Sequence, residues 1–344
     1  MREGQIFILM IVCLVAGWGL AAWVRRYAKC LRLVSIPNHR SSHVEPTPHG
    51  GGLGIVVGGL LSGIWLAWQQ GTAVPMVVTG LALLIATMGL IDDIRHLSVR
   101  LRFGVQVIAC AIMIMILEVI TWSSDVAVVN LSTEILLAGI LLVAGVWWIN
   151  LFNFMDGIDG IAGVEAVSML LGGSLLAVIS NPQAAGSPNI IWMLAIAAGT
   201  IGFLSLNWPP ARIFMGDVGS TFLAFMIFAF VLLTVRENGL SYPGWLILAA
   251  VFVSDATVTL LRRMLVGQRW FEAHRSHAYQ RLARRFGSHG PVTLTTLAIN
   301  LIWLLPLAWL SQQLPAWSWE ISIVAYAPLL VGAWRVGAGS NEHA

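Results

Sequence analysis

Five of the seven aspartates occur in three separate segments of the 344-residue chain, each at the end of an apolar run. They are Asp92 and Asp93, then Asp156 and Asp159 in NLFNFMDGIDG, and Asp217 in FMGDVGS. Mg²⁺ takes oxygen ligands, usually one or two carboxylates or amides, and substrate phosphates complete its shell. A single aspartate in such a place is usually a helix cap. Five in three segments instead favour a site for a divalent cation and a diphosphate.

Amides and glycines accompany these acids. Asn150, Asn153 and Asp156, or alternatively Asn153, Asp156 and Asp159, recur at intervals of three residues, which aligns their side chains along one stripe at a helix end. Gly157 and Gly216 stand beside the acids and let the backbone turn or approach a ligand closely. FMGDVGS also opens an apolar run, so its backbone N–H groups are expected to be available to phosphate.

A cationic segment, RWFEAHRSHAYQRLARRF, covers residues 269–286. Helical spacing gathers its basic side chains on one face, which contains His274, His277, Arg281 and Arg284 or Arg285. Two interpretations are open. The segment is either a helix pressed on anionic lipid, or a clamp for a diphosphate, to which Arg brings paired donors and His a titratable one. A zinc site is disfavoured, because two histidines three residues apart have no third ligand nearby.

Membrane helices must position these residues. Hydrophobic residues make up 58% of the chain, whereas Lys and Arg (19) and Asp and Glu (16) together make up 10%. That excludes a soluble globule, which carries roughly a quarter of charged residues, and three cysteines exclude a disulfide scaffold. A span needs about 20 apolar residues. The sequence therefore predicts an all-α polytopic membrane protein of ten or eleven helices, at about 6–24, 51–68, 74–91, 103–120, 134–149, 161–179, 190–206, 220–235, 243–261, 292–310 and 321–335.

Basic residues predict the orientation. With eleven spans, 17 of the 19 Lys and Arg residues and all eight histidines fall on one side, and only Arg2 and Arg236 fall on the other. By the positive-inside rule the richer side is cytoplasmic, so the N-terminus is periplasmic and the C-terminus cytoplasmic. We expect one membrane-embedded domain over residues 1–344, with active-site loops at about 25–50, 92–102, 150–160, 207–219 and 262–291.

Polar and small residues inside the spans allow two further predictions. Asp255 shares one helix face with Thr259 and Arg262, and a carboxylate in a span is costly. Asp255 is therefore expected to be either the partner of an arginine or part of a substrate pocket. The glycine pairs 54/58 and 59/63 repeat at four-residue spacing, which favours close helix packing.

Four motifs, DDIR, NLFNFMDGIDG, FMGDVGS and AHRSHAYQRL, stand in this order on alternate loops. Together they resemble those of the polyprenyl-phosphate N-acetylhexosamine-1-phosphate transferases, the MraY/WecA-like superfamily. The likeness is strongest to the WbpL-like bacterial enzymes that start O-antigen or other polysaccharide synthesis. The resemblance implies a Mg²⁺-dependent phosphotransferase of the bacterial inner membrane, with Mn²⁺ able to substitute. It would transfer an N-acetylamino sugar 1-phosphate from a UDP-sugar to undecaprenyl phosphate at the cytoplasmic face, releasing UMP.

The resemblance also implies which residues bind the metal and attack the substrate. Asp217 matches the central Mg²⁺ ligand, and Asn153 the second protein ligand. Asp92 and Asp93 match an acidic pair, one of which deprotonates or orients the lipid phosphate. A free phosphate monoester is already a nucleophile near neutral pH, since its second pKa is about 6. Direct attack by the lipid phosphate is therefore favoured over an aspartyl-phosphate intermediate.

Substrate contacts are implied by the same resemblance. Asp156 and Asp159 match acids on the nucleotide and sugar side of the pocket. Asn207 and Phe214 stand where relatives contact the uracil, Phe214 by stacking. The diphosphate is expected to be bound by His274, Arg275 and His277. Nucleic acid is not an expected partner, whereas membrane lipid is, and the resemblance is compatible with a homodimer.

The chain departs from the superfamily pattern in two places. Ser276 replaces the third-position histidine of the WecA motif, and His49 precedes the glycine-rich loop where close relatives often carry Arg.

Two other functions are alternatives. A proton- or cation-coupled transporter would use Asp255 and Glu165 near the midplane of the membrane, and usually has two pseudo-symmetric halves, which are not visible in this sequence. A CDP-alcohol phosphotransferase would place its acids in one continuous helix, which this chain lacks.

Overall fold

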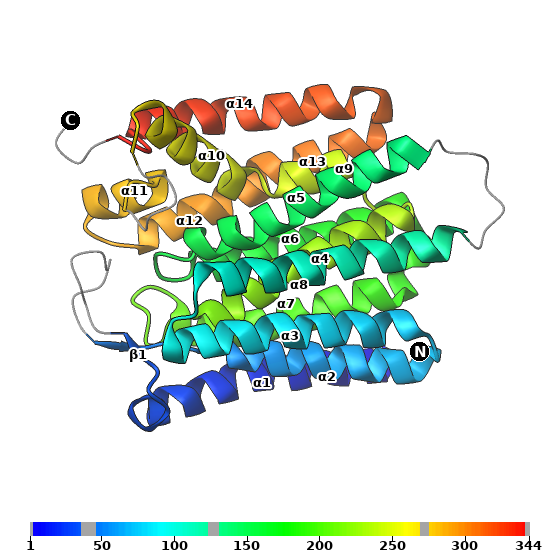
Figure 1. Cartoon of the computed structure of the whole chain (residues 1–344), viewed down its shortest axis with the longest axis horizontal. Helices are drawn as coiled ribbons and strands as arrows, with labels where there is room; N and C mark the ends of the chain where they lie inside the picture. Colours follow the sequence, from blue (N-terminus) through cyan, green and yellow to red (C-terminus); the bar gives the residue numbers. More distant parts are fainter. Residues whose placement is uncertain (1–2, 36–45, 123–130, 269–274, 341–344) are drawn as a thin grey trace.

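The computed structural model describes residues 3–35, 46–122, 131–268 and 275–340. Nearly all of these residues are helical, and the helices run side by side in one bundle (Figure 1). Ten helices are long and apolar enough to cross a membrane, and a bent pair makes an eleventh. The predicted all-α, multi-pass architecture is therefore confirmed for the described part of the chain.

The long helices follow the predicted spans, and shorter ones join them at the ends. In chain order the helices are α1 (Glu3–Leu31), α2 (Leu53–Gln70), α3 (Ala73–Arg95), α4 (Val99–Trp122), α5 (Leu131–Met155), α6 (Ile161–Ser180), α7 (Pro188–Asn207), α8 (Asp217–Arg236), α9 (Tyr242–Leu248), α10 (Ala250–Leu265), α11 (Ala278–Phe286), α12 (Gly290–Ala298), α13 (Leu305–Gln313) and α14 (Ser318–Val336). Short 3₁₀ turns lie at Pro182–Gly186 and Pro315–Trp317, and one π-helical turn at Ile299–Leu304 joins α12 to α13.

Three local features differ from the expected spans. α1 continues to Leu31, so Arg25, Arg26 and Lys29 lie on its last turns instead of in a loop. The predicted ninth span is broken into α9 and α10, whose axes differ by 74°. Two short antiparallel strands, β1 (Val34–Ser35) and β2 (Thr47–Pro48), pair within the region expected to be an irregular loop.

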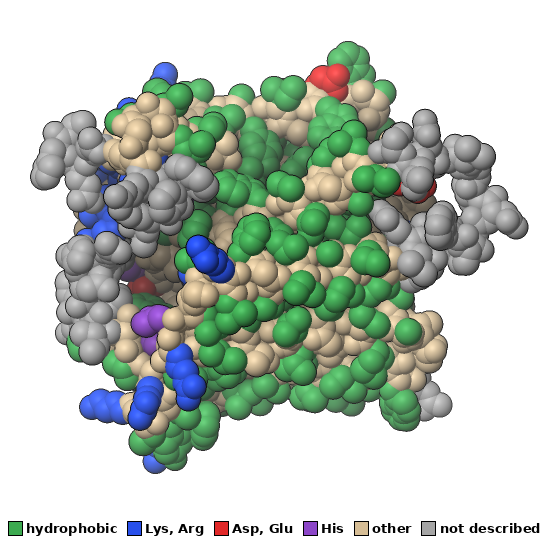
Figure 2. All heavy atoms as spheres, viewed as in Figure 1, with side chains coloured by type: hydrophobic (Ala, Val, Ile, Leu, Met, Phe, Trp, Pro, Cys, Tyr) green, Lys and Arg blue, Asp and Glu red, His purple; other side chains and the backbone are tan. Residues whose placement is uncertain are grey.

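Polar chemistry gathers at one end of the bundle. Lys and Arg side chains cluster at the end that carries β1 and α11, while hydrophobic side chains cover the flanks of the helices (Figure 2). This end, where α3 and α5 finish and α8 begins, is called the polar end below. The arrangement agrees with the loop-by-loop distribution of charge in the sequence.

α8 lies at the centre of the bundle. Sixteen of its 20 residues are buried, compared with five of the 29 residues of α1. α3 and α5 pack directly against α8. Asp217, the first residue of α8, is therefore carried by the most enclosed helix of the fold, which fixes its place at the polar end.

Glycines bring helices close together where the sequence predicted it. Gly54 lies against Gly17 of α1, and Gly59 lies against Phe222 of α8, so a Cβ at either position would overlap its neighbour. Gly89 does the same between α3 and α8, because a Cβ there would lie 2.5 Å from the carbonyl oxygen of Asp217. This close approach places the last turn of α3 beside the first turn of α8.

Gly89→Ala is expected to lower the unfolding midpoint in detergent, because overpacking typically costs about 1–3 kcal/mol. Gly80→Ala is the matched control on the same helix, since a Cβ at Gly80 meets nothing within 4 Å. That control should leave the midpoint unchanged or slightly raised. Equal effects of the two substitutions would contradict the close contact between α3 and α8.

Candidate active site

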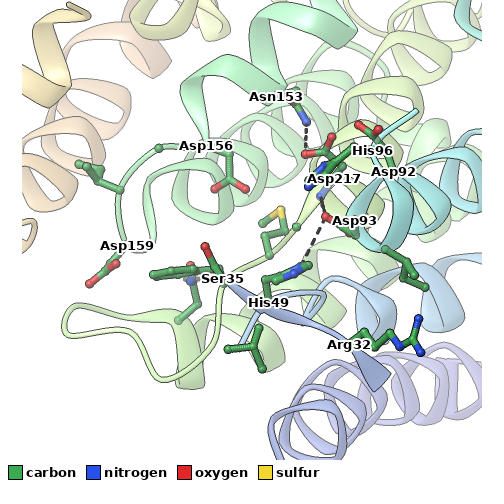
Figure 3. Close-up of a pocket in the computed structure, with 18 of the residues that line it drawn as sticks. Arg32, Ser35, His49, Asp92, Asp93, His96, Asn153, Asp156, Asp159 and Asp217 are labelled. Atoms are coloured by element: carbon green, nitrogen blue, oxygen red, sulfur yellow. Dashed lines mark hydrogen bonds and ion pairs between the residues drawn. The ribbon is translucent and has the colours of Figure 1, made fainter. Parts of the chain in front are cut away.

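A cavity of about 780 Å³ opens at the polar end. Its walls come from the end of α1 and β1, the junction of α3 and α4, the end of α5 and the turn after it, the segment before α8, α11, and the residue preceding α12 (Figure 3). The lining residues are Arg32, Val34, Ser35, His49, Asp92, Asp93, Ile94, His96, Arg102, Asn153, Asp156, Gly157, Ile158, Asp159, Asn207, Phe214, Met215, Gly216, Asp217, Gln280 and His289. All five predicted aspartates, together with Asn153, Asn207 and Phe214, therefore face one space.

The N-terminus of α8 is capped by a carboxylate from α3. Asp93 accepts the backbone N–H of Asp217 at 2.9 Å through Oδ1 and that of Val218 at 3.1 Å through Oδ2. Gly216 precedes them with φ +79°, and a Cβ on Gly216 would lie 2.7 Å from Asp93 Oδ2. Only glycine combines this backbone with this lack of bulk. Asp93 thus fixes where α8 begins.

The Asp217 carboxylate is held from two sides. The Asn153 amide donates to Oδ1 at 2.9 Å, and also to the Ser220 hydroxyl. The Arg102 guanidinium lies 3.7 Å from Oδ2 of Asp217 and 2.7 Å from Oδ2 of Asp92. Asp92 also accepts the backbone N–H of Leu97. Arg102 therefore bridges two of the acids that the sequence predicted.

The oxygen atoms at Asp217 and Asn153 suit a divalent cation that takes few protein ligands. Within the described residues, no three His, Cys, Asp or Glu side chains are grouped to enclose a metal ion. Asn153 uses its amide nitrogen toward Asp217, so its amide oxygen is the atom that would be available to an ion. Mg²⁺ is commonly bound by one or two such oxygens, with phosphate and water as the other ligands.

Asp156 stands among the other acids. It follows the C-terminal end of α5 and lies between Asp159 on one side and Asp93 and Asp217 on the other (Figure 3). Burial, and then the charges of Asp217, Asp93 and Asp159, hold the pKa of its carboxyl well above the ordinary value. The cavity therefore concentrates more negative charge than its own basic residues neutralise.

Asp159 and Asn207 connect the turn after α5 to the segment before α8. Asp159 Oδ2 accepts the Ala211 backbone N–H at 2.9 Å, and its Oδ1 lies 3.1 Å from Nδ1 of His289. Asn207 accepts the Gly160 N–H and donates to the carbonyl of Ile213. Both predicted substrate-binding residues thus brace the wall that they line, and Phe214 lies on the same wall.

His277 does not face the cavity. Its side chain is 2% exposed and its Nδ1 lies 3.2 Å from Oδ1 of Asp255 on α10. Asp255 also accepts the backbone N–H groups of Ala278 and Tyr279, each at 2.9 Å. The expectation that Asp255 pairs with an arginine or lines a pocket is wrong, because a histidine and the N-terminus of α11 occupy it. Arg275 is not among the lining residues, and His274 lies outside the described residues.

α11 reaches the cavity through other side chains. Gln280 lines it directly. The Tyr279 hydroxyl donates to the carbonyl of Phe154 at 3.0 Å and contacts Gly157, so it supports the turn that carries Asp156. Burial raises the pKa of Tyr279, so the hydroxyl remains a donor at neutral pH.

The arginines of the cationic segment bind the end of α14. Arg285 donates to the carbonyl of Val336, Arg281 to that of Ser340, and Arg262 of α10 to that of Ala338. The Arg262 guanidinium also lies 4.5 Å from the ring centroid of Trp334. Cations are favourable at a helix C-terminus, where carbonyls are unsatisfied. Neither predicted use of this face, lipid or diphosphate, includes this role.

Several lining residues were not predicted to belong to the site, above all Arg102, Gln280 and His289. Arg102 stands on the first turn of α4, ten residues after Asp92, which is a spacing that only a helix–turn–helix brings together. His49 reaches Asp93, with Nδ1 3.6 Å from Oδ1. Basic residues beside each acidic loop are the sequence signal that could have identified Arg102 as a site residue.

Comparison with known proteins places the chain in a family. The profile of glycosyl transferase family 4 matches residues 75–235, which run from α3 to α8. The probable undecaprenyl-phosphate N-acetylglucosaminyl 1-phosphate transferase of Bacillus subtilis is 31% identical over 314 residues, covering 88% of this chain and 84% of that protein. The chain belongs to glycosyl transferase family 4. The predicted superfamily is thereby confirmed.

Other relatives in this family are similar along most of their length. The decaprenyl-phosphate N-acetylglucosaminephosphotransferase of Mycobacterium tuberculosis H37Rv is 28% identical over 79% of this chain and 74% of that protein. The undecaprenyl-phosphate alpha-N-acetylglucosaminyl 1-phosphate transferase of Escherichia coli K12 is 28% identical over 91% and 88%. Family membership and the apolar helices make this chain a multi-pass membrane transferase.

Asp255→Asn is expected to lower the unfolding midpoint by roughly 5 °C or more, because it removes the charge from a buried pair and leaves one N–H of α11 unmatched. Ser254→Ala is the control on the preceding residue, whose buried hydroxyl has no partner among the described residues, so its loss should be neutral. Thermal unfolding in detergent measures both. A midpoint unaffected by Asp255→Asn would refute the cap.

Asp156→Asn is expected to stabilise the metal-free protein at pH 8. Because the pKa of Asp156 is raised above 3.8 in the folded state, its protonated form contributes stability at low pH, and that stability is lost as the pH rises through the folded pKa. The gain in midpoint over wild type should therefore be larger at pH 8 than at pH 5, with EDTA present at both. A pH-independent difference would contradict the charge repulsion.

Proposed function

We propose that the chain transfers an N-acetylamino sugar 1-phosphate from a UDP-sugar to undecaprenyl phosphate, giving undecaprenyl-diphosphate sugar and UMP. The observation that carries this proposal is the gathering of five aspartates, Asn153 and Arg102 around one cavity at the polar end. The names of the relatives support the lipid acceptor and favour N-acetylglucosamine as the sugar. The distribution of basic residues supports a cytoplasmic site in the bacterial inner membrane.

The reaction is one phosphoryl transfer. A non-bridging oxygen of the lipid phosphate forms a bond to the β-phosphorus of the UDP-sugar, and the bond from that phosphorus to the bridging oxygen breaks. UMP leaves with this oxygen and the electron pair. No proton has to move when the lipid phosphate is dianionic, and most of the rate is gained by positioning and by stabilising charge.

This chain's residues supply the positioning. Asp217 and Asn153 would hold Mg²⁺, and the ion, when bound, neutralises charge on the two phosphate groups that react. Arg102 keeps Asp92 and Asp217 at a fixed separation. Both oxygens of Asp93 accept N–H groups of α8, which supports a positioning role for Asp93 and direct attack by the lipid phosphate without an aspartyl-phosphate.

The transporter alternative is not supported by the two acids it would use. Asp255 binds His277 and the start of α11. Glu165 is fully buried and accepts a hydrogen bond from the amide of Asn300 at 2.7 Å.

The lipid product of the proposed reaction fits the first membrane step of O-antigen or related envelope polysaccharide synthesis, because a sugar diphosphate on a polyprenol can receive further sugars.

Purified protein in detergent, incubated with undecaprenyl phosphate, Mg²⁺ and a panel of UDP-N-acetylamino sugars, should release UMP. Asp217→Ala and Asp93→Asn are expected to abolish this release, because one removes the metal ligand and the other weakens the start of α8. EDTA should also stop the reaction, and Mn²⁺ should restore it in part.

Glu320→Gln is the control, since Glu320 is an exposed acid near the start of α14 and does not line the cavity. It should turn over like wild type. Each variant must also retain a cooperative unfolding transition in detergent. Near wild-type release of UMP by a folded Asp217→Ala protein would exclude the assigned site.

A further inference from the structure

His289 presents an imidazole to the cavity from the wall opposite the acidic pair. It precedes α12 and lines the cavity, although it lies outside the family-matched residues 75–235. Asp159, its partner, stands across the cavity from Asp92 and Asp93 (Figure 3). The other basic lining residues, Arg32, His49, His96 and Arg102, all belong to the chain before residue 103.

Asp159 fixes which ring nitrogen of His289 a ligand can reach. Nδ1 lies 3.1 Å from the Asp159 carboxylate and 3.3 Å from the backbone nitrogen of the same residue. Thr293, on the first turn of α12, donates to the Asp159 carbonyl at 2.7 Å and fixes the same wall. Among the described residues we find no hydrogen-bond partner for Nε2, so this nitrogen is left for a ligand.

The protonation states of the ring favour an anionic ligand. If Nδ1 accepts the Asp159 N–H, the proton of the neutral ring is on Nε2. When both nitrogens carry protons, Nδ1 donates to the carboxylate and Nε2 is also a donor. Nε2 is a donor in both states, and becomes an acceptor only in the neutral ring protonated on Nδ1. A donor at this place suits a phosphate oxygen, and the charged form makes the stronger bond.

We infer that His289, oriented by Asp159, binds a phosphate group of the nucleotide-sugar donor. The inference rests on the proposed function for the identity of this ligand. The donor is favoured over the lipid phosphate because Asp159 stands across the cavity from Asp93 (Figure 3) and its turn is bonded to Asn207 and to the segment that carries Phe214. His289 thus supplies on this wall the diphosphate contact that the buried His277 does not supply.

Two substitutions separate ligand binding from a merely structural role. The amide nitrogen of Asn reaches the place of Nδ1, whereas that of Gln reaches the place of Nε2. His289→Asn should keep the bond to Asp159 and lose the contact to the ligand. His289→Gln should keep a donor toward the ligand and lose the bond to Asp159. A purely structural histidine would give the opposite ranking of the two variants.

The test measures affinity for inorganic pyrophosphate and for UDP-N-acetylglucosamine, in Mg²⁺, by calorimetry on protein in detergent. His289→Asn should weaken both about 10- to 100-fold, the usual effect of losing a hydrogen bond to a charged group. His289→Gln should weaken them less than tenfold. The unfolding midpoint of His289→Asn should stay near that of wild type. Thr295→Ala, an exposed position on α12, should bind like wild type.

Kinetics provide the second readout. The KM for the donor should rise in the same order, Asn above Gln, while the KM for undecaprenyl phosphate stays unchanged. Equal pyrophosphate affinity in all four proteins, or a larger loss in Gln than in Asn, would overturn the inference. If no UDP-sugar yields UMP with wild type but the pyrophosphate ranking holds, the proposed function fails and the anion site stands.

Discussion

Two helices of this fold begin against a carboxylate that another helix supplies, and the site depends on both. The first N–H groups of a helix have no partner within it, and leaving them unpaired in a dry environment is costly. Gly216 has no side chain with which to cap α8, so Asp93 of α3 does so. Asp255 of α10 does the same for α11. Negative charge also suits the positive end of the helix dipole.

These caps explain how costly acids become useful. Asp92 and Asp93 end α3, where the helix dipole disfavours negative charge. They are compensated in different directions, Asp92 by Arg102 and the Leu97 N–H, Asp93 by α8. The Asp93 cap joins α3 to the central helix α8, far apart in sequence, and so fixes the acidic wall of the cavity, whereas the Asp255 cap fixes α11 against the preceding helix, α10. The residues that shape the site are thus also the ones that hold the bundle together at its polar end.

The architecture could be predicted because each span obeys a simple length and hydropathy rule, and the acids could be expected to meet because alternate loops share one face. The predicted glycine packing was correct at Gly54 and Gly59 for the same local reason. The bend between α9 and α10 carries no proline or glycine at its break, Ala249, so nothing local marked it. The roles that the resemblance to the transferase superfamily implies for the lining residues stay predictions.

The direction of single side chains was harder to predict. Helical spacing correctly grouped Arg281 and Arg285 but could not show that the end of α14, about 50 residues later, would bind both. His277 was drawn inward by Asp255, whose partner could not be known without the fold. His289 lies 12 residues after His277 and reaches the cavity only because α12 starts there. Tertiary neighbours, not local propensity, decide such contacts.

Charge balance connects the fold to the proposed reaction. Arg102 is shared by Asp92 and Asp217, while Arg262, Arg281 and Arg285 are engaged at the end of α14. Among the described residues that line the cavity, which include five aspartates, few cationic groups are then left for two polyanionic substrates. Electrostatic repulsion between the aspartates and the substrate phosphates would be large in a cavity of low dielectric constant. A divalent cation that bound together with the phosphates would relieve this repulsion, which is compatible with a site of so few protein ligands. In the proposed reaction, the metal is therefore expected to bind together with the substrates and not to the protein alone.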